Sequence, residues 1–148
     1  MNGMVIGAIG IALCVALCGA GSAIGLFQTG RAAAGVLAQK PKKFGGIMFL
    51  AVLPATQGIY GFVIGMIAQG KLVADMTMDK GWLVFAACIV LAISGFASAV
   101  FQGKTAVGGL NAMAKSDSSV GKLVLFPAMV ETYAILALVI SIIMLQFV

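Results

Sequence analysis

The sequence predicts an all-α integral membrane protein whose four transmembrane helices form two fused, duplicated helical hairpins. Three observations predict this class. Apolar residues make up 62% of the 148 residues and charged residues only 9%, whereas about 25% of a soluble domain is charged. Mean hydropathy is high, at +1.17. Finally, the apolar segments have the length of membrane spans, and the second half of the chain repeats the first.

The apolar segments are recognised by their lack of charge. Three of them contain no charged side chain: Met1–Gly30, Phe44–Gly70 and Gly81–Gly103. The fourth, Leu123–Val148, contains a single one, Glu131. Each is longer than the roughly 20 apolar residues that cross a bilayer. A signal peptide has a basic segment ahead of a short apolar run. Since nothing basic precedes Arg31, we expect the first segment to remain as a span.

The basic residues gather at two of the three connections, and their distribution predicts the orientation. At the middle connection Lys71 and Lys80 are balanced by Asp75 and Asp79. The other basic residues lie at the first and third connections: Arg31, Lys40, Lys42, Lys43, Lys104, Lys115 and Lys122. Basic loops stay in the cytoplasm. We therefore expect a multi-pass protein of the cell membrane with cytoplasmic 1–2 and 3–4 loops and both termini outside. The net charge of +5 then reflects topology and predicts no nucleic-acid partner.

Two halves of the chain resemble each other, which predicts two hairpin units, residues 1–74 and 75–148. The matching segments are Phe27-Gln28-Thr29-Gly30 with Phe101-Gln102-Gly103-Lys104, at an offset of 74, and Leu53-Pro54-Ala55 with Phe126-Pro127-Ala128, at an offset of 73. A gap of one residue reconciles the two offsets. Gly58 stands in the first unit where Glu131 stands in the second. One carboxylate therefore serves two hairpins.

Small residues mark one side of the first helix at spacings of three or four: Gly7, Gly10, Cys14, Cys18, Gly21 and Gly25. Such a stripe lets helix backbones approach closely in lipid. Packing within one bundle explains it, but its length and narrowness favour a helix crowded against copies of itself in the inner wall of a ring. Cys14, Cys18 and Cys88 are interpreted as small packing residues, since the chain has no histidine and no C-x-x-C motif.

Glu131 is the candidate functional residue. A carboxylate inside the membrane costs about 2.5 to 3.5 kcal/mol on insertion scales, and such residues mark ion pathways by default. It lies eight residues past Leu123, about 12 Å into its helix at 1.5 Å per residue, too deep to reach water. It must be protonated or neutralised by a cation. The alternative is a purely structural role, in which a protonated glutamic acid is hydrogen-bonded to a neighbouring helix.

Polar side chains on two other helices are expected around Glu131. One face of the second helix carries Leu53, Thr56, Gln57 and Tyr60 at spacings i, i+3, i+4, i+7, and one face of the third carries Ser94, Ser98 and Gln102. Matching arm lengths bring Gln57, Gln102 and Glu131 to one level, provided that the third helix continues past Lys104 towards Ala114. Pro54 and Pro127 lack an N–H and predict matched kinks beside the site.

This oxygen-rich set suggests a bound cation. A protonated carboxyl group needs one acceptor, whereas Thr56, Gln57, Gln102 and a backbone carbonyl would supply several. Hydroxyl and amide oxygens around one carboxylate are hard ligands that suit a dehydrated alkali or alkaline-earth ion. A single negative charge favours a monovalent ion. The composition therefore favours sodium, with a proton as the alternative.

The motifs Leu53-Pro-Ala-Thr-Gln-Gly-Ile-Tyr60, Phe101-Gln-Gly-Lys104 and Pro127-Ala-Met-Val-Glu-Thr-Tyr133 resemble the four-helix proteolipid (the K or c type) of V-type ATPases, in particular the bacterial sodium-translocating form. The resemblance covers essentially the whole chain. It implies a rotor ring with the first and third helices inside, and a subunit that is not itself catalytic, with ATP hydrolysis on other subunits. It also implies sodium ligation by Glu131, Gln102, Thr56, Gln57 and the Leu53 carbonyl, with Tyr60 hydrogen-bonded to the carboxylate.

The implied partners are copies of the chain, lipid, a stator membrane subunit that supplies an arginine, and a central-stalk subunit on the cytoplasmic loops. No cofactor is implied beyond the transported Na⁺ or H⁺. Two other classes compete. A small multidrug-type exporter also has four helices and one membrane glutamate, but places it in the first span in an aromatic cavity, whereas here it is in the last span and Trp82 is the single tryptophan. A structural tetraspan protein would leave Glu131 unexplained.

Overall fold

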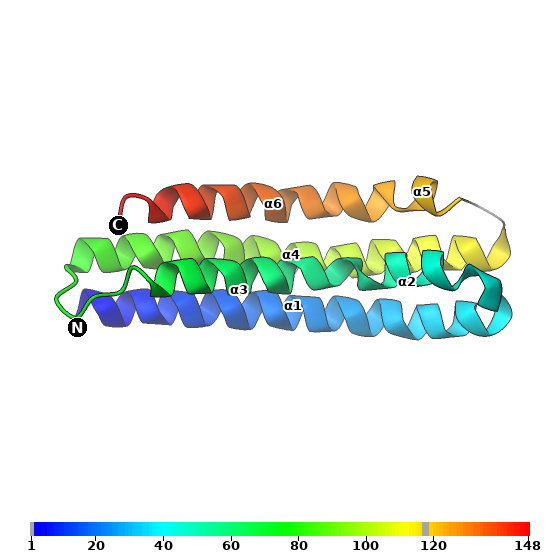
Figure 1. Ribbon diagram of the computed structural model, residues 1–148, viewed down its shortest axis with the longest axis horizontal. Helices are drawn as coiled ribbons and strands as arrows, with labels where there is room; N and C mark the ends of the chain where they lie inside the picture. Colours follow the sequence, from blue (N-terminus) through cyan, green and yellow to red (C-terminus); the bar gives the residue numbers. More distant parts are fainter. Residues whose placement is uncertain (1, 117–118) are drawn as a thin grey trace.

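Four long helical segments lie side by side in the computed structural model, which describes residues 2–116 and 119–148 (Figure 1). The first is α1 (Gly3–Gln39), and the third is α4 (Met78–Lys115). The second is interrupted and consists of η1 (Pro41–Lys43), α2 (Phe44–Val52), η2 (Leu53–Ala55) and α3 (Thr56–Gln69). The last consists of α5 (Val120–Leu123) and α6 (Leu125–Leu145). Within the described residues, all four segments are long and apolar enough to cross a membrane, as predicted.

Both hairpins open toward the same end of the bundle. The two chain ends lie at the end that also holds the α3–α4 connection (Figure 1). There Asn2 accepts a hydrogen bond from the Met4 N–H at 3.3 Å, which caps α1, and donates from Nδ2 to the Ala74 carbonyl at 2.7 Å. Lys80 Nζ donates to the Val148 carbonyl at 3.0 Å. The N-terminus is thereby held against the connection between the two hairpins.

Helices α1 and α4 form the tightly packed centre of the bundle. They continue well beyond the charge-free segments, so the expected extension of the third helix past Lys104 is confirmed. Glycines of the two helices meet closely: a methyl group added to Gly103 would lie 2.6 Å from the Gly25 Cα. The hydrophobic effect does not drive helices together in lipid, so close backbone contact of this kind stabilises the helix pair through van der Waals packing. Any larger residue at Gly103 would push α1 and α4 apart.

The small-residue stripe of α1 faces the chain's own helices, so the expectation that this face meets other copies is wrong. Gly10 packs against Phe85, and Gly21 packs against the backbone of Phe96, both in α4. Cys14, Cys18 and Cys88 are buried free thiols, as expected of packing residues. The reason is geometric: α4 and α3 together cover the whole stripe, so no part of it remains for another protomer.

The two expected proline kinks differ in the structure. At Pro54 the helix does break, since α2 ends at Val52 and a short 3₁₀ turn precedes α3. Pro127 lies in the first turn of α6, and the last span is interrupted three residues earlier, at Val124 between α5 and α6. Because Pro127 has no N–H, the Leu123 carbonyl loses the partner that would have continued α5 into α6. Both hairpins therefore have an interruption beside a proline, and the one at Pro54 takes the form of a 3₁₀ turn.

Candidate ion-binding site

The carboxylate of Glu131 is held from two sides. It lies on the part of α6 that faces α3 and α4, and its residue is half-buried. Tyr60 donates its hydroxyl hydrogen to Oε1 at 2.7 Å, and Gln102 donates from Nε2 to Oε2 at 3.0 Å. Hydrogen bonds to an ionised group are roughly twice as strong as neutral ones. Both carboxylate oxygens are therefore fixed in position by side chains from two other helices.

A second layer of amides orients the first. Gln57 donates from Nε2 to the Gln102 Oε1 at 2.8 Å and to the Ser98 Oγ at 3.1 Å, while Ser98 donates to the Val130 carbonyl at 3.1 Å. Gln57 and Gln102 are completely buried. A buried amide without partners would cost the desolvation energy of each polar group. The linked chain avoids that cost and fixes the rotamers of both glutamines.

The proline break places backbone oxygen beside this network. Because Pro54 has no N–H, the helix cannot continue regularly through it, and the 3₁₀ turn Leu53–Ala55 leads directly into α3. Thr56 donates to the Leu53 carbonyl at 3.1 Å and to the Gln57 Oε1 at 3.3 Å. One hydroxyl, one carbonyl and one amide oxygen thus gather at the start of α3, on the side of the helix that faces α4.

All six sequence-predicted site residues meet in one network: Glu131, Gln102, Thr56, Gln57, Leu53 and Tyr60. Ser98, noted in the sequence only as part of a shared face, joins it through Gln57. Ser94, one turn away, does not, because it donates to the Tyr133 carbonyl at 3.0 Å. The spacing of four residues in α4 indicated the shared face, but not how far along it the site extends.

The set is rich in oxygen and has one formal charge. Glu131 bonds a phenol and an amide rather than a lysine or arginine within the described part of the chain. Carboxylate, amide, hydroxyl and carbonyl oxygens are the ligands of hard cations. The amide groups can exchange their oxygen and nitrogen by turning about the terminal torsion. The arrangement can therefore hold either a proton or a small monovalent cation.

The equivalent place in the first hairpin lacks this chemistry. There Thr29 is fully buried and donates to the Ala51 carbonyl at 2.6 Å, much as Gln102 donates to the Pro127 carbonyl at 3.3 Å. At the offset of 73 the position of Glu131 is occupied by Gly58. The first hairpin therefore has no carboxylate at this level.

Comparison with known proteins agrees with this architecture. The family model for the C subunit of ATP synthase matches the chain twice, over residues 9–68 and 85–144. The K subunit of the V-type sodium ATPase of Enterococcus hirae is 41% identical over 140 residues, which cover 95% of this chain and 90% of that protein. The K subunit of the A-type ATP synthase of Methanocaldococcus jannaschii is 39% identical over 142 residues, 96% of this chain and 62% of that protein. The chain thus belongs to the ATP synthase C-subunit family of membrane proteins.

Proposed function

We propose that this chain is the rotor-ring subunit of a rotary V-type ATPase, and that Glu131 carries one sodium ion through the membrane. The observation that carries the proposal is the oxygen cluster around Glu131, in which Tyr60 and Gln102 hold both carboxylate oxygens. The name of the Enterococcus hirae relative, a V-type sodium ATPase subunit, supports the same cargo. The subunit would be non-catalytic, and ATP hydrolysis would take place on other subunits.

The expected sodium ligands are Glu131, Gln102, Thr56, Gln57 and the Leu53 carbonyl. For Gln102 to coordinate, its amide would turn so that Oε1 rather than Nε2 faces the carboxylate, and the positive ion would replace the lost N–H donor. Tyr60 keeps its hydrogen bond to Oε1 and stays outside the coordination sphere. Five oxygens with one negative charge fit a monovalent cation better than a divalent one. Proton transport on the same glutamate is the second candidate.

We infer that copies of the chain assemble side by side in a ring through a second stripe of small residues on α1. This stripe lies opposite the buried one and is exposed in the single chain: Ala8, Ala12, Ala16, Gly19, Ala23, Gly30 and Ala34. A methyl group at Gly30 would meet nothing within 4 Å. Small exposed residues of this kind allow close helix contact in lipid.

The duplication also predicts the register between copies. Within the chain, Tyr60 reaches Glu131. If copies repeat that arrangement around the ring, Tyr133 of one protomer would reach the Gly58 region of the next. Tyr133 is 69% exposed in the single chain, so its hydroxyl is available. Cysteines introduced by Gly58→Cys and Tyr133→Cys should form disulfide-linked ladders under mild oxidation, whereas Gly58→Cys paired with Leu136→Cys should not.

Two further partners, a stator subunit and a central-stalk subunit, are expected to contact different parts of the chain. A stator subunit would bring an arginine to Glu131 from the α6 side, where Met129 and Tyr133 are exposed. A central-stalk subunit would contact the basic loops around Lys42 and Lys122, which we place in the cytoplasm; Asp117, also expected there, is outside the described residues. A cysteine at position 42 that reacts with an impermeant reagent from outside intact cells would contradict this orientation.

The direct test is sodium uptake by the assembled ATPase. The holoenzyme in sealed vesicles should accumulate sodium on ATP addition, and Glu131→Gln should abolish the uptake because the amide cannot neutralise the ion. The matched control is Thr132→Val, since Thr132 is exposed and donates to the Met129 carbonyl of its own helix. Sodium uptake that survives Glu131→Gln would refute the role of this residue.

A further inference from the structure

We propose that Ser22 of α1 is a positioning residue of the sodium site, which holds the start of α3 and thereby the ligands Thr56 and Gln57. The inference rests on the sodium site proposed at Glu131 and deepens it. Ser22 lies within a charge-free span and is only 6% exposed. Its Oγ accepts a hydrogen bond from the Gly58 N–H at 2.8 Å. Because Gly58 directly follows Gln57, this bond is made one residue beyond the expected ligands.

The start of α3 has no capping side chain of its own. The first N–H groups of a helix lack intrahelical partners, and the side chain at the N-cap position usually accepts from the second or third of them. Here Ala55 occupies the N-cap position and makes no side-chain hydrogen bond. Gly58 is the third residue of α3, and the serine that accepts from its N–H lies 36 residues earlier in the chain. Ser22 therefore acts as an N-cap that is supplied by another helix.

The same face of α1 also contacts the other side of the proline break. A methyl group added to Gly25 would lie 2.5 Å from the Pro54 Cβ, closer than any side chain could approach. Gly25 and Ser22 are three residues apart and therefore share one face of α1. Their two contacts lie on either side of Thr56 and Gln57 in the chain. Helix α1 thus fixes in position the short segment that supplies both of these side chains to the site.

The affinity of an ion site depends on how well its ligands are held. Ligand sets work when their geometry is fixed to within roughly 0.5 Å, and groups that orient ligands without touching the ion contribute about 10- to 100-fold to affinity. Without the serine oxygen, the Gly58 N–H would lose its partner, and the start of α3 would shift with Thr56 and Gln57. Glu131 would stay in place, because it lies on α6. Loss of the Ser22 hydroxyl should therefore weaken sodium binding more than proton binding.

The test measures carbodiimide labelling of Glu131 in the purified, assembled protein over a range of sodium concentrations. Ser22→Ala should raise the sodium concentration that halves the labelling rate roughly tenfold, because the cap of α3 is lost. Ser22→Thr keeps a hydroxyl on the same carbon and should stay within about twofold of the wild type. In sodium-free buffer the labelling of all three proteins should depend on pH in the same way, because the proton binds to Glu131 alone.

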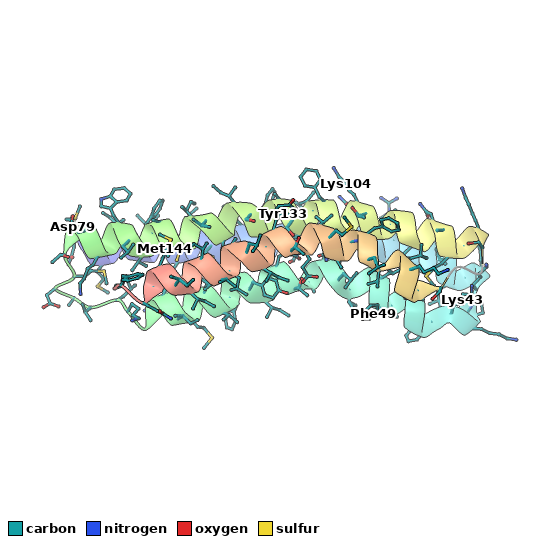
Figure 2. The ribbon with its side chains drawn as sticks, turned by 90° about the horizontal axis from the view of Figure 1, so that it is seen from above. Lys43, Phe49, Asp79, Lys104, Tyr133 and Met144 are labelled. Carbon is teal, nitrogen blue, oxygen red and sulfur yellow. The ribbon has the colours of Figure 1, made fainter. Side chains whose placement is uncertain are left out.

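The matched control is Ser141→Ala. Ser141 is fully buried and donates to the Ala87 carbonyl at 2.7 Å, so its hydroxyl also joins two membrane-spanning helices. It lies ten residues beyond Glu131, about 15 Å further along α6. Figure 2 shows the nearby Met144 close to one end of the bundle, whereas Tyr133, which is two residues from Glu131, lies near the middle. The control variant should lower thermal stability and leave sodium protection unchanged.

The outcomes separate the role of Ser22 from the sodium site itself. Wild-type labelling that does not respond to sodium would overturn the sodium site, and the role of Ser22 with it. If wild-type labelling does respond, unchanged protection in Ser22→Ala would overturn the role of Ser22 alone. Equal losses in Ser22→Ala and Ser22→Thr would also overturn it, because the effect would then come from side-chain shape. An equal loss in Ser141→Ala would do the same, by showing that any loosening of the bundle weakens sodium binding.

Discussion

The two hairpins have the same plan, but only the second carries a carboxylate. Gly58 occupies the place of Glu131, and in that place the Gly58 N–H donates to the Ser22 Oγ at 2.8 Å. On α1, the buried Thr29 donates to the Ala51 carbonyl of the same hairpin. The first hairpin contributes Thr56 and Gln57 to the network around Glu131 but has no carboxylate of its own in its spans. The second presents two fixed carboxylate oxygens instead.

The same comparison extends to the helix that completes each site. Thr56 and Gln57, which belong to the network around Glu131, correspond at the offset of 73 to Met129 and Val130. Neither of these apolar side chains offers an oxygen. An ion site in this fold therefore needs three helices to be polar at one level, and a glutamate alone on one hairpin would not make one.

Moving the carboxylate is the strongest way to break this comparison. Glu131→Gln should abolish labelling by a carboxyl-reactive carbodiimide and abolish sodium uptake. Adding Gly58→Glu to that variant should not restore uptake, because Ser22 of α1 rather than an amide faces Gly58, and an uncompensated carboxylate in the span costs about 2.5 to 3.5 kcal/mol. Mass spectrometry of the labelled peptide and vesicle uptake are the measurements. Restored uptake would mean that the polar surroundings are dispensable.

We expect the next largest difference in sodium protection between variants of two buried hydrogen-bond donors, Gln102 in the second hairpin and Thr29 in the first. Gln102→Ala should raise the sodium concentration needed to protect Glu131 from carbodiimide by roughly 10- to 100-fold, the equivalent of about 1.5 to 3 kcal/mol for an interaction with a charged group. Thr29→Val removes a donor from a backbone carbonyl and should lower thermal stability without changing sodium protection. Equal shifts in sodium protection for both variants would contradict the account.

We expect the smallest difference in sodium protection between variants of Tyr60 and Tyr133, the two tyrosines at matching positions of the hairpins. Tyr60 donates to Glu131 at 2.7 Å, whereas Tyr133 is exposed. Tyr60→Phe should weaken sodium protection by up to about tenfold, because one hydrogen bond is lost and no ligand is removed. Tyr133→Phe should leave protection within about twofold of the wild type. A larger loss of sodium protection in Tyr133→Phe than in Tyr60→Phe would contradict the assignment of Tyr60 as the tyrosine that contacts Glu131.

Much of this fold and site could be predicted because lipid allows few solutions. Charge-free segments predicted the four spans, and the helical spacing from Leu53 to Tyr60 predicted the polar face that meets Glu131. The ends of α1 and α4 could not be predicted from charge, because long basic side chains such as Lys104 remain exposed on a continuing helix.

The partner of the small-residue stripe could not be predicted either. The stripe around Gly21 correctly indicated a close helix contact, but a sequence does not say whether the partner helix belongs to the same chain.

The most direct test of the central claim is sodium protection of Glu131 in the purified, assembled protein. The rate of carbodiimide labelling should fall as sodium rises, with potassium chloride at equal ionic strength as the control. More sodium should be needed at lower pH, because protons and sodium compete for the same carboxylate and the reagent attacks the protonated acid. Labelling that is indifferent to sodium over a broad pH range would contradict a sodium site and identify a proton site.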